Sequence, residues 1–110
     1  MKRFAASKIV FCRDCVLNNH VIEIEGKFVI KDYSLENEEE ATEWIGGMIV
    51  LSPYNDVKIL SDISICDFID KYASKERGTS SYAWHIFNTD ITCNSVINKH
   101  NIVLLNGTSL

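Results

Sequence analysis

Apolar and charged residues alternate along the first half of the chain, and this pattern predicts β-strands. Within residues 21–25, isoleucine alternates with glutamate, so one face of such a strand would be apolar and the other charged. Gly26 interrupts the run, and residues 27–33 continue in an extended, β-branched style. Two runs joined at a glycine are typical of a β-hairpin. Further strands are expected at residues 4–11 and 46–51, where Gly46 and Gly47 indicate a bulge or a close backbone approach.

The periodicity changes in the second half, where a short amphipathic helix is expected over residues 64–77. Ser64 would be its N-cap, and Asp67 three residues later completes a box-like capping pattern. Gly78 is a natural stop at the C-terminal end. The apolar stripe is expected to lie on a sheet as core. Its members are Ile65, Cys66, Ile69, Tyr72 and Ala73.

Taken together, these elements predict a mainly β fold. Two more strands are expected at residues 82–87 and 102–105. The expected architecture is a small β-sandwich of about six to eight strands with one short helix near 64–77. A chain of 110 residues suffices for one domain with a modest core, and no repeat or low-complexity linker divides it. We therefore expect a single domain over residues 1–110.

Composition narrows the classes of partner. Hydrophobic residues make up 46% and charged residues 24% of the chain, which is ordinary for a soluble globular protein. A net charge of −4 gives no global basic field, so nucleic acid is not an expected partner. No stretch is long enough to cross a membrane, and the first residues lack the apolar core of a signal peptide. We expect a cytoplasmic protein whose four cysteines are free thiols.

The sharpest local motif is the Cys-x-x-Cys pair of Cys12 and Cys15. Thiols at this spacing chelate zinc or form a redox-active pair. His20 is near in sequence, so Cys12, Cys15 and His20 are the candidate metal ligands. A structural zinc needs a fourth ligand, whereas Cys66 and Cys93 are isolated. Inert cysteines without a cofactor are the favoured interpretation, and a small metal-binding or redox protein is the alternative.

Other catalytic signals are weak. The sequence has neither a Gly-x-Ser-x-Gly elbow nor a glycine-rich phosphate loop. A hydrolase with an unrecognised site around His85, Tyr82 and nearby carboxylates is a further hypothesis. The aromatic residues Trp44, Trp84 and Tyr82 are expected in the core rather than on a stacking surface for a base or sugar.

Three runs of the sequence, taken in order, form a distinctive pattern of hydrophobic residues and glycines. They are residues 4–10, 20–30 and 43–53, the last of which contains Gly46 and Gly47 and ends at Pro53. This arrangement resembles the N-terminal segment of the amidohydrolases, the metal-dependent hydrolases that include guanine deaminases. The resemblance implies a small β-sandwich, called the composite domain, which in that family lies beside a metal-binding barrel.

The sequence departs from the family pattern directly after Pro53. The family continues with a glycine and, shortly afterwards, an aspartate or asparagine before a metal-binding His-x-His pair. Here Tyr54 follows Pro53, and after Asp56 no histidine occurs before His85. The chain is also far shorter than a catalytic barrel of roughly 250 residues. None of the family's metal ligands can therefore be carried over.

The leading hypothesis is a stand-alone domain that resembles the accessory sandwich of amidohydrolases and lacks catalytic activity. It would act through protein contacts, as an interaction or oligomerisation module. The expected partner is a second copy of the chain or a larger protein, since a small sheet exposes strand edges that can pair.

Overall fold

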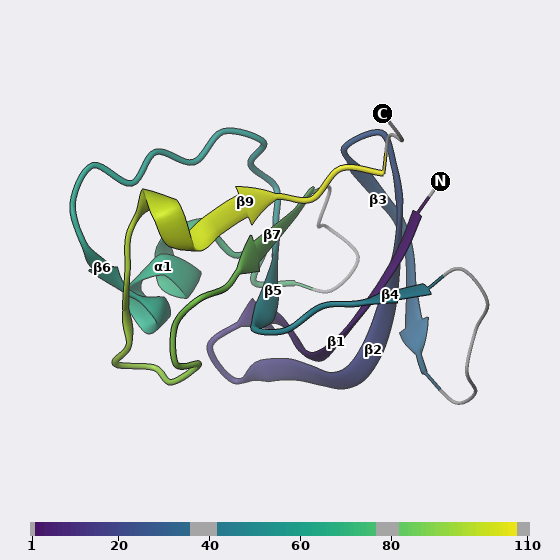
Figure 1. Cartoon of the computed structure of the whole chain (residues 1–110), viewed down its shortest axis with the longest axis horizontal. Coiled ribbons are helices and arrows are strands. Elements are labelled where there is room, and N and C mark those ends of the chain that lie inside the picture. The colour runs from purple at the N-terminus through teal and green to yellow at the C-terminus, as the bar shows by residue number, and fades with distance from the viewer. Residues whose placement is uncertain (1, 36–41, 77–81, 108–110) are drawn as a thin grey trace.

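A computed structural model describes residues 2–35, 42–76 and 82–107 of the chain (Figure 1). Its strands are β1 (Lys2–Cys12), β2 (Cys15–Glu25), β3 (Phe28–Ser34), β4 (Thr42–Trp44), β5 (Met48–Ser52), β6 (Ile63–Ser64), β7 (Tyr82–Ile86), β8 (Val96–Ile97) and β9 (Ile102–Leu104). The helical elements are α1 (Ile65–Tyr72) and the 3₁₀ turn η1 (Lys99–Asn101). The prediction of a mainly β fold with one short helix is confirmed. The predicted hairpin at Gly26 is the β2–β3 connection.

Seven strands form one mixed sheet in the order β3-β2-β1-β5-β7-β9, with β4 also paired to β1. Strand β1 is antiparallel to β2 but parallel to both β4 and β5. Since β4 pairs with the start of β1 and β5 with its later part, β4 and β5 together follow one line along β1. Strands β6 and β8 form a separate two-stranded ribbon beside α1 (Figure 1).

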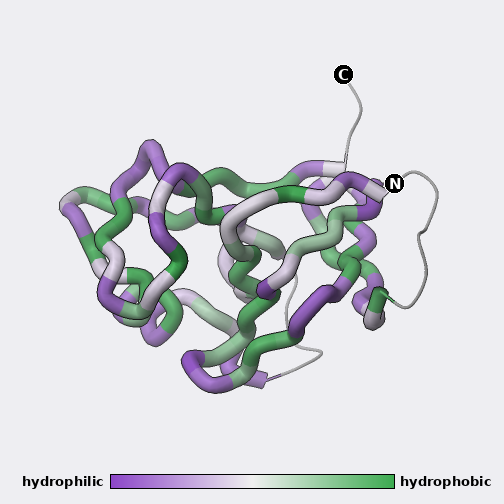
Figure 2. The backbone as a smooth tube through the Cα atoms, turned by 60° about the horizontal axis from the view of Figure 1, so that its bottom comes forward, coloured by the Kyte–Doolittle hydropathy of each residue, from purple (hydrophilic) through white to green (hydrophobic). Residues whose placement is uncertain are grey.

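The sheet curls, so that its edge strand β3 approaches β7 near the opposite edge. The ring of Phe28 in β3 lies 5.4 Å from that of Tyr82 in β7. Beyond β9, the Gly107 N–H donates to the Gly26 carbonyl at 2.6 Å, which ties the chain's later part to the β2–β3 turn. Hydrophilic and hydrophobic stretches alternate along the backbone (Figure 2).

Two hydrophobic clusters share strand β5. Ile49 and Leu51 belong to the cluster inside the curl, whereas Met48 and Val50 belong to the cluster beneath helix α1. Because side chains alternate along a strand, β5 faces both clusters and every one of its residues is buried. The curl encloses Phe4, Ala6, Ile9, Ile22, Ile24, Ala83 and Leu105. The helix side holds Val10, Ile65, Phe68, Ile69, Ala73, Ile86 and Ile97.

Helix α1 begins where the sequence predicts and ends earlier. The Ser64 side chain caps it and accepts the Asp67 N–H at 3.1 Å. The predicted end at Gly78 is wrong, because the helix stops at Tyr72. Its last carbonyl accepts the Ser52 hydroxyl at 2.6 Å, and the Ser74 N–H donates to the Leu51 carbonyl at 2.9 Å. The chain is thus drawn off the helix by hydrogen bonds to β5. Residues 77–81, which include Gly78, lie outside the described part.

Gly47 is required where β4 gives way to β5. Its φ of 75° lies in the left-handed region, and a Cβ there would clash with the backbone carbonyl oxygen of Ile86. The neighbouring Gly46 has open space where a Cβ would be added. Of the two alternatives that the glycines indicated, a bulge or a close backbone approach, the structure shows a close approach at Gly47, next to Ile86 of β7.

Replacing Gly47 with alanine is expected to lower the free energy of unfolding by about 2–4 kcal/mol, since both the backbone angle and the clash oppose a side chain. Gly46→Ala is the matched control and should change stability by less than about 1 kcal/mol. Urea unfolding followed by circular dichroism measures both. Equal losses in the two variants would contradict this account of the β5–β7 approach.

Candidate functional site

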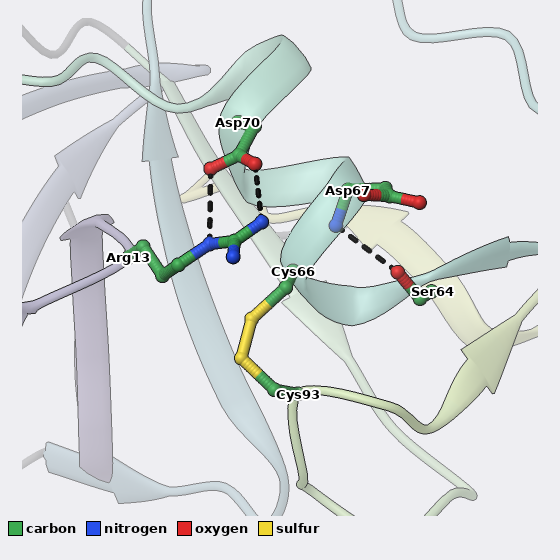
Figure 3. A network of polar contacts seen from close by, with 6 residues as sticks. All are labelled: Arg13, Ser64, Cys66, Asp67, Asp70 and Cys93. Atoms are coloured by element: carbon green, nitrogen blue, oxygen red, sulfur yellow. Dashed lines mark hydrogen bonds and ion pairs between the residues drawn. A yellow bond between two sulfur atoms is a disulfide. The ribbon is translucent and has the colours of Figure 1, made fainter.

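The tip of the β1–β2 hairpin lies against helix α1. Arg13 donates through Nε to Asp70 Oδ1 at 3.3 Å and through Nη2 to Asp70 Oδ2, so the pair is bidentate (Figure 3). Both side chains are exposed. An exposed ion pair adds little to stability, so its main effect is to orient the hairpin tip on the helix.

All four cysteines, each within the described residues, form disulfides. Cys12 and Cys15 close the hairpin tip, with 4.7 Å between their Cα atoms. Cys66 in α1 is joined to Cys93 in the loop before β8, with 4.8 Å between the Cα atoms (Figure 3). The expectation of free thiols is therefore wrong. Because cytosolic reductants keep thiols reduced, the bonds favour an oxidising environment over the cytoplasm. The cytoplasmic location itself stays a prediction.

A hollow of about 130 Å³ opens beside the Cys66–Cys93 bond. Two cationic residues, Lys8 and Arg13, lie on its wall. Its apolar lining comes from Val10, Val16, Met48, Ile65, Ile69 and Ile91. Several of these residues belong to the cluster beneath α1, so the hollow is where that core reaches the surface. A small apolar group with an anionic end matches this lining.

Backbone hydrogen bonds hold the loop of Cys93 to the start of α1. The Ile65 N–H donates to the Ser95 carbonyl at 2.9 Å, and the Cys66 N–H donates to the Cys93 carbonyl at 3.2 Å. The first N–H groups of a helix have no partner within the helix, so these loop carbonyls satisfy them. The loop and the helix N-terminus therefore form one unit, which the disulfide closes.

The candidate metal ligands Cys12, Cys15 and His20 do not converge on one site. Cys12 and Cys15 bind each other, and the Nε2 of His20 lies 2.7 Å from Asp32 Oδ1. His20 is buried on the inner side of the curl, two residues along β2 from Ile22. Within the described ranges, no three His, Cys, Asp or Glu side chains gather as metal ligands would. Zinc binding stays a prediction that requires the reduced cysteines.

The disulfide between Cys12 and Cys15 agrees with the redox alternative, but neither cysteine lies where a helix dipole would favour its thiolate. A reactive thiol is commonly found at a helix N-terminus, whose dipole favours the thiolate. Both residues lie at the ends of strands, with a two-residue turn between them. The helix N-terminus is instead occupied by Cys66, which sequence reasoning set aside as isolated. The Ser64 cap two residues earlier was the signal that could have identified it.

The hypothetical hydrolase residues do not converge. Tyr82 and His85 are three residues apart on β7, so their side chains project to opposite faces. The Nε2 of His85 donates to the Gly46 carbonyl at 2.6 Å, which fixes the proton on that nitrogen. Trp84 is buried, as expected, and its indole donates to the Tyr54 carbonyl at 2.9 Å. The expectation that Trp44 is core is wrong, because this side chain is exposed on β4.

A second polar network lies on the outer face of the β1–β2–β3 sheet. Glu23 Oε2 accepts hydrogen bonds from Arg3 Nε at 3.2 Å and from the Tyr33 hydroxyl at 2.9 Å. Burial alone would raise the pKa of Glu23, but these two hydrogen bonds and the charges of Arg3 and Lys31 together hold that pKa below its usual value. The alternating pattern placed Glu23 on a charged face, and the structure shows that this side chain is buried there.

Comparisons with protein-family models, with curated proteins and with solved structures found no match. These comparisons give the resemblance to amidohydrolases no support, and it stays a prediction. Among the helices in the described part of the chain, none has the length and apolarity needed to cross a bilayer.

Glu23 is expected to make stability depend on pH in the acid range. Its folded pKa is lowered, so its contribution is present above the unfolded value near 4.5 and is lost as pH falls through the folded value. Glu23→Gln should therefore lose less stability than the wild type between pH 7 and roughly pH 3. Urea unfolding at the two pH values tests this. The exposed Glu25 on the same strand, changed to Gln, is the control, and identical pH dependence in all three proteins would refute the prediction.

The two disulfides are expected to stabilise the chain unequally. They span sequence separations of 27 and 3 residues, for which loop-closure entropy gives about 3.5 and about 1.6 kcal/mol. Changing both Cys66 and Cys93 to alanine should therefore reduce the free energy of unfolding about twice as much as changing Cys12 and Cys15. Denaturant unfolding of the two double variants measures the difference, and the reverse order would contradict it.

Proposed function

We propose that this chain is a non-catalytic β-domain that acts through protein contacts, and that strand β3 is its contact edge. The observation that carries the proposal is the exposure of Phe28 and Ile30, at 55% and 50% of their surfaces. On one side β3 pairs with β2, and within the described residues no strand pairs with its other side. Such an edge presents backbone N–H and C=O groups that can pair with another strand.

The proposed partner is a second copy of the chain. The opposite edge strand, β9, has only three residues, whereas β3 has seven. Two copies of β3 have the same length of seven residues, so they can pair with each other across a two-fold axis. Among the described strands, pairing of β3 with β3 leaves only the three-residue strand β9 as the outer edge of each copy. These features favour a closed dimer over an open-ended stack of sheets.

The resemblance to the accessory sandwich of amidohydrolases supports a non-catalytic role. The sequence lacks the His-x-His pair that would follow Pro53. After Pro53 the chain returns through α1 to β7, which pairs directly with β5. In the proposed relationship, this short connection takes the place of the barrel. The chain would then correspond to the accessory sandwich of the family without its catalytic barrel.

Light scattering across a range of concentrations tests the dimer. The wild type should associate, and Ile30→Lys should be monomeric because it places a second charge beside Lys31 on the pairing edge. Val103→Lys is the matched control, since Val103 is 46% exposed on the other edge strand, β9. That variant should associate like the wild type. A wild type that is strictly monomeric at high concentration, or equal loss of association in both variants, would overturn the proposal.

A further inference from the structure

The two sulfur atoms of the Cys66–Cys93 bond lie in different surroundings. Cys66 belongs to α1 and is only 5% exposed. Cys93 is exposed and lies in residues 88–95, all of them described, which contain neither helix nor strand. A thiol approaching from solvent therefore reaches the sulfur of Cys93 and not that of Cys66.

The surroundings of Cys66 favour a negative charge on its sulfur. It is the second residue of α1 after the Ser64 cap, where the helix dipole stabilises anions. Lys8 and Arg13 line the hollow to which Cys66 also contributes. The bidentate contact with Asp70 offsets part of the Arg13 charge, so Lys8 and the helix dipole contribute the remainder. Asp70 is bound to Arg13, and the carboxylate of Asp67 points away from the disulfide (Figure 3).

We propose that Cys66–Cys93 is an exchangeable disulfide, with low-molecular-weight or peptide thiols as its reactants. The thiolate of the reactant attacks the sulfur of Cys93 and forms a mixed disulfide there. The Cys66–Cys93 bond breaks, and its electron pair leaves on Cys66 as a thiolate. A second thiolate then attacks the reactant's sulfur, which releases the reactant as its disulfide and leaves Cys93 as a thiolate. The protein gains two electrons, and both sulfurs take up protons from solvent as their pKa values require.

The Cys12–Cys15 bond is not suited to the same reaction. Both residues are partly buried, and neither lies in a helix. A separation of only three residues also keeps the two sulfurs close after the bond opens, so the pair recloses before a second thiol arrives. The chain thus holds one structural and one reactive disulfide. Opening the reactive one leaves the loop of Cys93 attached to α1 by backbone hydrogen bonds alone.

Reduced glutathione is the probe for this reaction on the fully oxidised, full-length chain. Samples are quenched with N-ethylmaleimide at intervals, and peptide masses locate each adduct. We expect glutathione on Cys93, N-ethylmaleimide on Cys66, and loss of Cys66–Cys93 at least about tenfold faster than loss of Cys12–Cys15. The rate should rise in proportion to the glutathione concentration, because the reaction occurs in the folded protein.

Variants of Arg13 test the charge argument. Arg13→Gln should slow the opening about threefold or more, Arg13→Lys should restore most of the rate, and Lys31→Gln on the remote strand β3 should leave it unchanged. Three outcomes would overturn the proposal. They are glutathione on Cys66, faster opening of Cys12–Cys15, and a rate that saturates with glutathione and is the same for both bonds, which would mean reaction only after unfolding.

Discussion

Strand β5 is the element on which both cores depend. Its side chains fill the inside of the curled sheet on one face and the space beneath helix α1 on the other. A chain of 110 residues can bury only a modest core, and one strand that contributes to two clusters reduces the number of apolar residues needed. It also makes the approach of β5 to its neighbours critical, and Gly47 permits that approach at Ile86.

Helix α1 depends on the same strand. Ser52 and Leu51 of β5 bond the end of the helix, and Ser64 caps its beginning. A helix of eight residues is too short to be stable by itself in water, so its contacts with β5 and the Cys66–Cys93 bond hold it. The reactive surroundings proposed for Cys66 follow directly from this placement, because its position at the helix N-terminus is fixed from both sides.

Only part of the candidate site could be predicted from the sequence. The Cys-x-x-Cys motif attracted attention because its spacing is local, and the structure gives that pair a structural place at the hairpin tip. Cys66 and Cys93 are 27 residues apart, so only folding could show that they meet. The same holds for Arg13 and Asp70, whose pairing joins a hairpin tip to a helix. Alternation assigned Glu23 to a charged face, but it could not show that Arg3 and Tyr33 would bond its carboxylate.

Local physics determined the longer elements of this protein. Alternation and short apolar runs predicted the strands now seen as β1, β2, β3, β5, β7 and β9, and the capping residues predicted where α1 begins. Strands β4, β6 and β8 went unpredicted, because their two or three residues do not belong to a longer apolar or alternating run and become strands only through their partners. The helix end, the disulfide pairing and the curl were likewise decided by tertiary structure. Each arises from contacts between segments far apart in the chain, about which a local pattern holds no information.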